Sequence, residues 1–322
     1  MPSSDVLVIG GGVIGLSVAH ECARRGASVT LLSDGAPGAS LAAAGMLCPA
    51  FEAMQTGGRA LAGMGLASLG LWDAYAARLG DAGTLGYERR GTVGVGYPPR
   101  ALPGTPAPVP AGIEAGGAVL VAGEGQVDPR RLAGALARAC GASGVRAARG
   151  RAARLTAEGA RVTGAELAGG EVLSANATVA ATGAGALVPG VRLTGVRGRA
   201  FLVRNTLGLD RVVRSPSVYL APKPDGLLYV GATEEEAGAS RDGPAAPDGL
   251  WSEACWLAPS LRGAGVLARF DGVRPRTEDE LPMIGPHGAL TGPVLALGHH
   301  RNGVLLAPLT AARAADAALG RA

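Results

Sequence analysis

The stretch "VLVIGGGVIGLSVAHECARRGASVTLL", residues 6–32, decides the fold of this 322-residue chain. Residues 6–9 are a short, continuous apolar run, which is typical of a strand buried on both faces. Apolar residues then recur at helical spacing through residues 14–22, and Gly26 stands where a helix C-cap is expected. A second apolar run follows at residues 29–32. The stretch therefore predicts a strand, a helix and a second, parallel strand.

The turn between the first strand and the helix carries the glycine pattern of a dinucleotide-binding site. Gly10 permits a tight turn, Gly12 lets the backbone approach a pyrophosphate, and Gly15 lets the helix pack closely on the strand. The helix that begins here, with Val13 and Ile14, offers free N–H groups and a positive dipole end to phosphates. The pattern directly follows a predicted strand and opens a predicted helix, and a second strand follows that helix. We therefore predict a dinucleotide site rather than a purely structural turn.

The residue expected to hold the adenosine ribose departs from this pattern. An acidic residue ordinarily ends the second strand. Here that position holds Ser33, and Asp34 follows one residue later. Either Asp34 reaches the ribose after a small shift or Ser33 makes a weaker neutral bond, and the sequence leaves both open.

Composition excludes several classes of protein. The chain is 48% hydrophobic and carries a formal net charge of only +4, as expected of a folded globular protein rather than a disordered one. Its densest basic run, residues 146–154, has no interleaved aromatic residue for base stacking, which favours a solvated face and predicts no nucleic-acid partner.

Cysteine usage and hydropathy bear on location. Cys22, Cys48, Cys140 and Cys255 show neither CxxC spacing nor neighbouring histidines, so we expect reduced thiols and no metal site. No apolar run approaches the ~18 residues of a membrane-spanning helix, and the N-terminus lacks a signal-peptide pattern. These features predict a soluble, cytoplasmic protein with no membrane partner.

Small residues follow the second strand in "GASLAAAGMLCP", residues 38–49. Such residues would let the backbone run flush against a flat ligand. The helix propensity of alanine would explain the same residues, and taken alone this stretch leaves both interpretations open.

Five motifs together resemble one family. Besides the N-terminal glycine motif they are "AAAGML" (42–47), "GATEEEAG" (231–238), "GVRPRTEDELPMIG" (272–285) and "GHHRNGVLLAP" (298–308). In this order and spacing they resemble the D-amino-acid oxidase family of FAD-dependent oxidoreductases, and within it the glycine oxidases of thiamine biosynthesis. The resemblance covers nearly the whole chain.

The resemblance implies an α/β fold, α+β overall, with two domains. A Rossmann-like FAD-binding domain, discontinuous in sequence, would comprise residues 1–76, 126–194 and 268–322. A substrate-binding domain built on an antiparallel sheet would comprise residues 77–125 and 195–267.

The residues agree with this division in outline. Asp128 and Pro129 predict the start of a helix that returns the chain to the first domain. Residues 177–186 predict a short buried strand that ends in a glycine turn. The segments rich in Pro and Gly at 97–117 and 238–249 are expected to be loops.

The family implies how an amino acid is held. Arg274 would bind the substrate carboxylate, since a guanidinium matches a carboxylate with two parallel hydrogen bonds. Tyr219 would also reach the carboxylate, and Arg301 would be a second arginine on the substrate side. No catalytic acid or base is implied beyond these positioning residues, because amine oxidation by flavin requires mainly placement of the substrate.

The motif at 298–308 is expected to lie along the flavin. By resemblance, His299, Asn302 and Gly303 contact FAD mostly through the main chain, while His300 is part of the wall. A helix beginning near Val304 would direct its positive end at the ring and stabilise the anionic reduced flavin. Arg301 is a cofactor contact as well. The remaining implied FAD contacts are Ala39, Ser40, Ala44, Gly45, Met46, Ala152, Gly183 and Leu305.

The leading hypothesis is therefore an oxidase with non-covalent FAD. It would use O2 to convert glycine, sarcosine and small D-amino acids to the imine or 2-oxo acid with release of H2O2, supplying glycine imine for the thiamine thiazole. A D-amino-acid dehydrogenase with another electron acceptor, a tRNA-modification flavoprotein and a non-catalytic flavoprotein are the alternatives. A homo-oligomer and the orientation of Glu234, toward the pocket or toward solvent, are left open.

Overall fold

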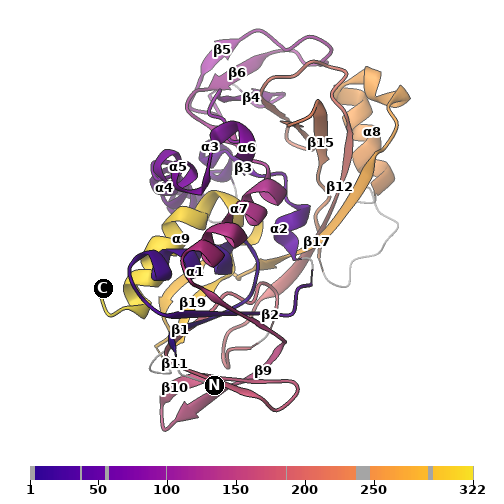
Figure 1. Cartoon of the computed structure of the whole chain (residues 1–322). Helices are drawn as coiled ribbons and strands as arrows, with labels where there is room; N and C mark the ends of the chain where they lie inside the picture. The colour runs from indigo at the N-terminus through magenta and orange to yellow at the C-terminus, as the bar shows by residue number, and fades with distance from the viewer. Residues whose placement is uncertain are drawn as a thin grey trace.

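The computed structural model of the protein is organised by two large β-sheets, beside a two-stranded one. The structure describes residues 4–36, 38–54, 58–98, 100–185, 187–236, 247–288 and 293–321. In Figure 1 the first sheet lies in the lower half and the second sheet, with helix α8, in the upper half. No helix within the described ranges is long and apolar enough to cross a membrane.

The first sheet is parallel at its centre and builds the predicted Rossmann-like half. Its parallel strands are, in spatial order, β19 (Pro293–Leu297), β11 (Val172–Ala180), β1 (Ser4–Ile9), β2 (Val29–Ser33) and β8 (Arg146–Arg149). Strand β18 (Met283–Pro286) pairs antiparallel with β19 at one edge. The hairpin of β9 (Ala152–Glu158) and β10 (Arg161–Leu167) extends from β11. The strand–helix–strand prediction for residues 6–32 is confirmed.

Three helices cover one face of this sheet: α1 (Val13–Arg24), α7 (Pro129–Ala142) and α9 (Gly303–Ala318). Helix α1 ends at Arg24, two residues before Gly26, whose φ of +93° is readily adopted only by glycine. Helix α7 begins as predicted, because the Asp128 carboxylate accepts hydrogen bonds from the N–H groups of Arg130 and Arg131. The apolar faces of these helices and strand β1 form the main core.

The second sheet is largely antiparallel. Its path runs through β16 (Glu235–Glu236), β12 (Thr194–Arg204), β15 (Leu227–Gly231), β14 (Tyr219–Lys223), β13 (Val212–Arg214), β4 (Thr92–Val95), β6 (Ala118–Val121) and β5 (Thr105–Ala107). Strand β17 (Ala268–Arg276) pairs with β12. Asp225 and Gly226, both at positive φ, close the hairpin between β14 and β15. Helix α8 (Pro247–Leu257) packs against this sheet.

Short elements connect the two halves. They are α2 (Ala39–Ala42), β3 (Met46–Leu47), α3 (Pro49–Glu52), α4 (Gly58–Leu69), α5 (Trp72–Leu79), α6 (Ala82–Leu85), β7 (Gly125–Gln126) and the 3-10 turns η1 (Pro259–Gly263) and η2 (His300–Asn302). A buried lysine also joins the halves, since the Lys223 ammonium on β14 donates to the Gln126 side chain and to the carbonyl of Val127, just before α7.

Two expectations about the chain's organisation differ from the structure. The predicted FAD-binding segment 268–322 includes β17, which the structure places in the second sheet because it pairs with β12 from Ala268 to Arg276. The expected loop 97–117 contains strand β5, which pairs with β6. Most of the other expected loop, residues 238–246, lies outside the described residues.

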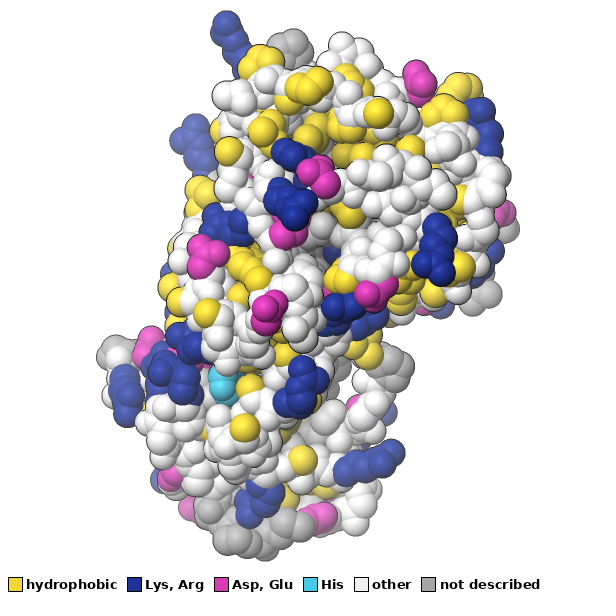
Figure 2. All heavy atoms as spheres, turned by 45° about the horizontal axis from the view of Figure 1, so that its top comes forward, with side chains coloured by type: hydrophobic (Ala, Val, Ile, Leu, Met, Phe, Trp, Pro, Cys, Tyr) yellow, Lys and Arg dark blue, Asp and Glu magenta, His cyan; other side chains and the backbone are white. Residues whose placement is uncertain are grey.

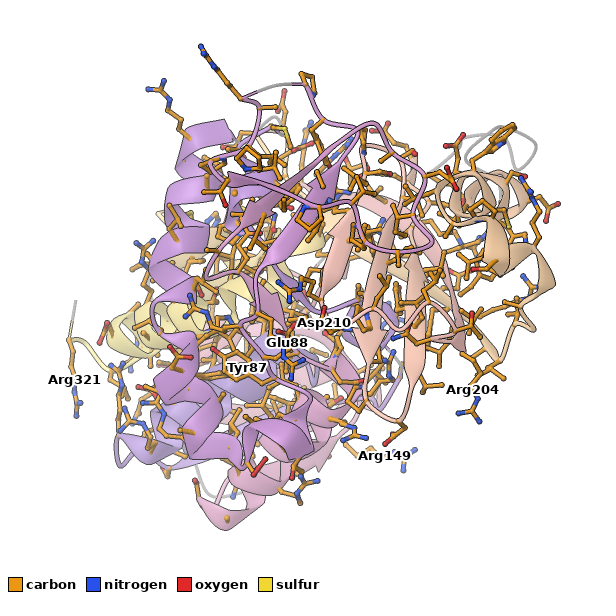
Figure 3. The ribbon with its side chains drawn as sticks, turned by 90° about the horizontal axis from the view of Figure 1, so that it is seen from above. Tyr87, Glu88, Arg149, Arg204, Asp210 and Arg321 are labelled. Carbon is orange, nitrogen blue, oxygen red and sulfur yellow. The ribbon has the colours of Figure 1, made fainter. Side chains whose placement is uncertain are left out.

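The basic side chains are spread over the surface. On the face that Figure 2 shows, arginines lie apart from one another and among acidic side chains. Arg149, Arg204 and Arg321 point outward at separate edges in Figure 3. Within the basic run 146–154, Arg146 donates to the Thr30 hydroxyl and Arg154 pairs with Glu166. This distribution fits solvated arginines, and the absence of a nucleic-acid partner stays a prediction.

Candidate active site

A large cavity follows the carboxyl ends of the parallel strands and continues to the second sheet. Its volume is about 860 Å3, and it is lined from Gly10 at the end of β1 to Tyr219 and Arg274 on β14 and β17. Residues that directly follow β1, β2, β8, β11 and β19 all line it. Ligands of open α/β sheets bind at this edge, and the size lies within the range of roughly 300–1,000 Å3 that is usual for ligand sites.

The glycine turn after β1 has the close packing that its sequence predicts. A Cβ at Gly10 would lie 2.2 Å from the carbonyl oxygen of Ala181, and one at Gly15 would lie 1.8 Å from the carbonyl oxygen of Gly10. Gly12 is the N-cap of α1 and has no side chain of its own to cap the helix, while the Ser40 hydroxyl accepts from the N–H of Val13 at 3.1 Å. Gly12, Val13 and Ile14 line the cavity, so an anionic pyrophosphate there would be stabilised by the positive end of the helix.

Ser33 and Asp34 both line the cavity beside this turn. The Ser33 hydroxyl accepts a hydrogen bond from the N–H of Gly35 and lies against Gly11, where a Cβ would come within 2.4 Å of it. Asp34 is exposed, and its Oδ1 accepts from the N–H of Ala36 at 3.0 Å. Both side chains reach the expected ribose end.

The small residues after β2 run along the cavity wall. Residues 42–46 all line it, and only the first of them is helical. Gly45 has a φ of +75°, and a Cβ there would lie 2.2 Å from the carbonyl oxygen of Val127. This stretch is thus held flush against the cavity by a position that only glycine can occupy, and helix propensity is not what explains its alanines.

The turn at 298–303 faces the cavity with its backbone. Gly298 has a φ of +74°, and a Cβ there would collide with Thr277. The His299 ring is turned inward to Thr310, with Nε2 2.9 Å from the hydroxyl. Burial lowers the pKa of His299 to about 3, so this ring is neutral. Its side chain is structural, and its main chain lines the cavity.

The N-terminus of α9 is also open toward the cavity. Its N-cap residue, Asn302, makes no capping bond, because its amide donates instead to Glu52 Oε2 at 3.1 Å. Helix α9 begins at Gly303, one residue before the predicted start near Val304. The N-termini of α1 and α9 therefore both lie at one cavity, where each would stabilise an anionic group of a ligand.

The two implied carboxylate-binding side chains lie together in space, although 55 positions separate 219 from 274 in the chain. Arg274 Nη1 donates to the carbonyl of Thr233 at 3.2 Å. Burial raises the pKa of the Tyr219 hydroxyl, so the group stays protonated and can donate a hydrogen bond. Tyr219 stacks on Tyr229, which is held by a hydrogen bond to the carbonyl of Ala42.

Two glycines make room for these side chains. A Cβ on Gly198 of β12 would lie 2.2–2.4 Å from the guanidinium atoms of Arg274. A Cβ on Gly231 of β15 would lie 2.6–2.7 Å from the phenol of Tyr219. Both glycines are consequently positioning residues, since any larger residue would displace a side chain of the site.

The charges near Tyr219 are unequally compensated. Arg214, Arg274 and Arg301 all act electrostatically on the Tyr219 hydroxyl. Arg214 forms a buried ion pair with Glu52 at 3.2 Å, and Arg301 lies 3.6 Å from Glu234. Among the described residues, Arg274 has no carboxylate within ion-pair distance. It is the one of these three arginines that is available to an incoming anion.

Most of the predicted site residues line the cavity. They are Gly10, Gly12, Val13, Ile14, Ser33, Asp34, Ala39, Ser40, Ala44, Gly45, Met46, Ala152, Gly183, Tyr219, Arg274, His299, His300, Arg301, Asn302, Gly303 and Val304.

Two of the predicted cofactor contacts do not line the cavity. Gly15 packs against the carbonyl of Gly10 instead, in the helix–strand role that its motif predicts. Leu305 is in the core, and its carbonyl accepts hydrogen bonds from Ser68 and Trp72. Leu305 lies in the first turn of α9. Its side chain faces the core because the helix packs there against α4 and α5.

The sequence interpretation missed the ion pair of Arg214 and Glu52 and the two positioning glycines. Arg214 lies on β13 beside Tyr219, and its guanidinium also stacks over the ring of Phe51. Gly198 faces Arg274 only through the pairing of β12 with β17. No local motif carries this information, since it depends on which strands become neighbours.

The donor set fits FAD and offers no metal centre. No group of three or more His, Cys, Asp or Glu side chains that could hold a metal ion occurs in the described part of the chain. The glycine turn and the first turn of α1 would hold the pyrophosphate, Ser33 or Asp34 the ribose, and the walls formed by residues 42–46 and 298–303 the flat ring. Fold and site together define a flavin-dependent oxidoreductase whose cavity also presents Arg274 to an anionic group.

Comparison with known proteins also indicates a flavin-dependent oxidoreductase. A model of the DAO family, described as FAD dependent oxidoreductase, matches residues 5–317. The chain belongs to this family, and its cofactor is FAD.

Within this family the chain is similar to glycine oxidases. The chain is 31% identical to a glycine oxidase of Geobacillus kaustophilus, over 97% of this chain and 92% of the relative. The crystal structure of glycine oxidase from that organism superimposes with a TM-score of 0.88 at 29% identity, covering 100% of this chain and 96% of the other.

A second kind of relative is longer. The bifunctional protein ThiO/ThiG of Synechocystis sp. is 32% identical over 98% of this chain. This chain spans about half the length of that relative, 51%.

Proposed function

We propose that this protein is an FAD-dependent oxidase of glycine and other small amino acids, such as sarcosine and small D-amino acids. The observation that carries the proposal is Arg274, which has no carboxylate within ion-pair distance among the described residues, beside the protonated Tyr219, in the cavity that would also hold the cofactor. The names of the relatives, glycine oxidase and ThiO/ThiG, support the choice of substrate and a role in supplying glycine imine for the thiamine thiazole.

Arg274 and Tyr219 would position the substrate by its carboxylate. Two charge-assisted bonds from the guanidinium and one from the Tyr219 hydroxyl fix the orientation of the α-carbon and the amine. The stacked rings of Tyr229 and Phe270 support Tyr219 from behind. Bound FAD would accept a hydride from the α-carbon, and O2 would then take up the two electrons to give H2O2. The imine would react with water to give the 2-oxo acid and ammonia, or the 2-oxo acid and methylamine when sarcosine is the substrate.

The cofactor is proposed to be bound non-covalently, since the His299 ring is turned away to Thr310 and the Cys48 thiol is buried against Thr92. Precipitation of the protein in acid should leave the yellow colour in the supernatant. Colour retained in the pellet would contradict this part of the proposal.

The function is tested by mixing purified protein with glycine, sarcosine and D-alanine. We expect anaerobic bleaching of the flavin and, in air, consumption of one O2 and release of one H2O2 per amine. Bleaching with fast dye reduction but negligible O2 uptake would instead identify a dehydrogenase. A flavin that no amine bleaches would identify a non-catalytic protein.

A further inference from the structure

Glu234 and its neighbour Thr233 contact the two arginines of the cavity, Arg301 and Arg274. Glu234 directly follows Thr233, whose carbonyl accepts from Arg274. Its own carboxylate lies 3.2 Å from His300 Nε2 and 3.6 Å from Arg301 Nη2. Residues 233 and 234 thus reach two neighbouring arginines of the cavity, one through the backbone and one through a side chain.

Glu234 remains ionised at neutral pH. The neighbouring His300, together with the charges of Arg301 and Arg274, lowers the pKa of the Glu234 carboxyl to about 2. The His300 side chain is almost fully buried, at 4% exposure, while the Glu234 side chain is 41% exposed. A negative charge therefore stands beside His300 and Arg301, both of which line the cavity, although Glu234 itself is not part of the lining.

This arrangement gives Arg274 and Arg301 different roles. Arg274 is available to the carboxylate that every amino acid carries. Arg301 already has an anionic partner, so a second acidic group on a substrate would have to displace Glu234 or lie beside a like charge. Like charges at close range are disfavoured, and specific sites use such repulsion to exclude competing ligands.

We propose that Glu234 determines substrate specificity: by pairing with Arg301 it selects amino acids with one acidic group and excludes those with two. The inference rests on the proposed function and names the substrate class of the same site. It assigns to Glu234 a role in selection, whereas Arg274 holds the substrates that are accepted.

Removal of the charge tests the inference. In the FAD-loaded Glu234→Gln variant, Arg301 would be free to bind a second carboxylate. We expect the ratio of kcat/KM for iminodiacetate to that for glycine to rise at least tenfold over the wild-type ratio. Iminodiacetate is glycine with a second carboxymethyl group on nitrogen, so the comparison isolates the added charge.

Glu236→Gln is the matched control. It makes the same charge change two residues away, where Glu236 pairs with Arg276 rather than with His300 and Arg301. The substrate ratio of this variant should stay within twofold of wild type. A ratio that is unchanged in Glu234→Gln, or one that rises equally in Glu236→Gln, would overturn the proposal.

A binding measurement separates this inference from the proposed function. Calorimetric titration of the FAD-loaded protein with malonate and with acetate needs no turnover. The Kd ratio should shift at least tenfold in favour of malonate in Glu234→Gln and not in Glu236→Gln. If glycine failed to bleach the flavin while this shift occurred, the function would be wrong and the role of Glu234 upheld. If glycine bleached the flavin but the Kd ratio did not shift, the function would be upheld and the role of Glu234 would be wrong.

Discussion

The two ends of the cavity are built in opposite ways. At the adenosine end, the glycine turn, Ser33 and Asp34 come from one continuous stretch of about 30 residues, in which Gly10 has a φ of +122° and Gly15 packs on the Gly10 carbonyl. At the substrate end, Tyr219 and Arg274 meet only because β12, β14, β15 and β17 pair in one sheet, and Arg301 joins them from η2, after the last strand of the other sheet. The comparison teaches that the cofactor end depends on local chain geometry and the substrate end on strand register.

The largest effect is expected from replacing Arg274. Loss of two charge-assisted hydrogen bonds, each worth about 1.5–3 kcal/mol, should lower kcat/KM for glycine by roughly 10²- to 10⁴-fold in Arg274→Ala. Arg274→Lys should restore little of this, because a point charge cannot reproduce the planar fork. FAD content, measured by absorbance, should remain near the wild-type value. A loss of FAD in parallel with activity would contradict the separation of the two ends.

Gly198→Ala should damage the substrate end without touching its functional groups. The added methyl would overlap the guanidinium of Arg274 and displace it, so kcat/KM should fall by about 10- to 100-fold, which corresponds to roughly 1.4–2.8 kcal/mol. Gly195→Ala is the matched control on the same strand, since its Cβ would meet only the exposed Val273 side chain, at 3.0 Å. Equal losses in both variants would show that a methyl group on β12 is harmful in general.

Lys223 should make the junction of the two halves sensitive to pH. Burial lowers the pKa of Lys223 to about 7, whereas an unfolded lysine titrates near 10.4. Between these values the unfolded chain binds more protons, so the lysine's contribution to stability rises with pH and is lost as the pH falls through 7.

Urea unfolding of wild type and Lys223→Met at several pH values measures this contribution. The difference in unfolding free energy should change in favour of wild type by about 2 kcal/mol from pH 7 to pH 9. Parallel pH profiles would mean that the lysine is already charged in the folded protein.

The smallest effect is expected at the ribose. Asp34→Ala should weaken FAD binding by about 1.5 kcal/mol, or roughly tenfold, because an ionised acceptor is lost. Ser33→Ala, which removes a neutral hydroxyl, should cost about 1 kcal/mol or less. Dissociation constants from FAD titration of the apoprotein measure both. A larger loss in Ser33→Ala would assign the ribose to the serine that lies against Gly11.

The same contrast explains how much the sequence could predict. Gly10, Gly12, Gly45 and Gly298 stand where a turn or a close approach requires glycine, and such requirements are visible in a motif. The ion pair of Arg214 and Glu52 and the clearance at Gly198 were not predicted, since they arise from strand pairing between distant segments. The sequence left the orientation of Glu234 open, and the structure places its carboxylate beside His300 and Arg301.

The central claim is that Arg274 is the anchor for the substrate carboxylate. It is tested most directly by the rate of anaerobic flavin reduction in wild type and Arg274→Ala, with glycine and with methylamine, which is glycine without its carboxylate. We predict a loss of roughly 10²-fold or more with glycine and almost none in the already slow reaction with methylamine. An equal loss with both amines would contradict the claim and make Arg274 a structural residue.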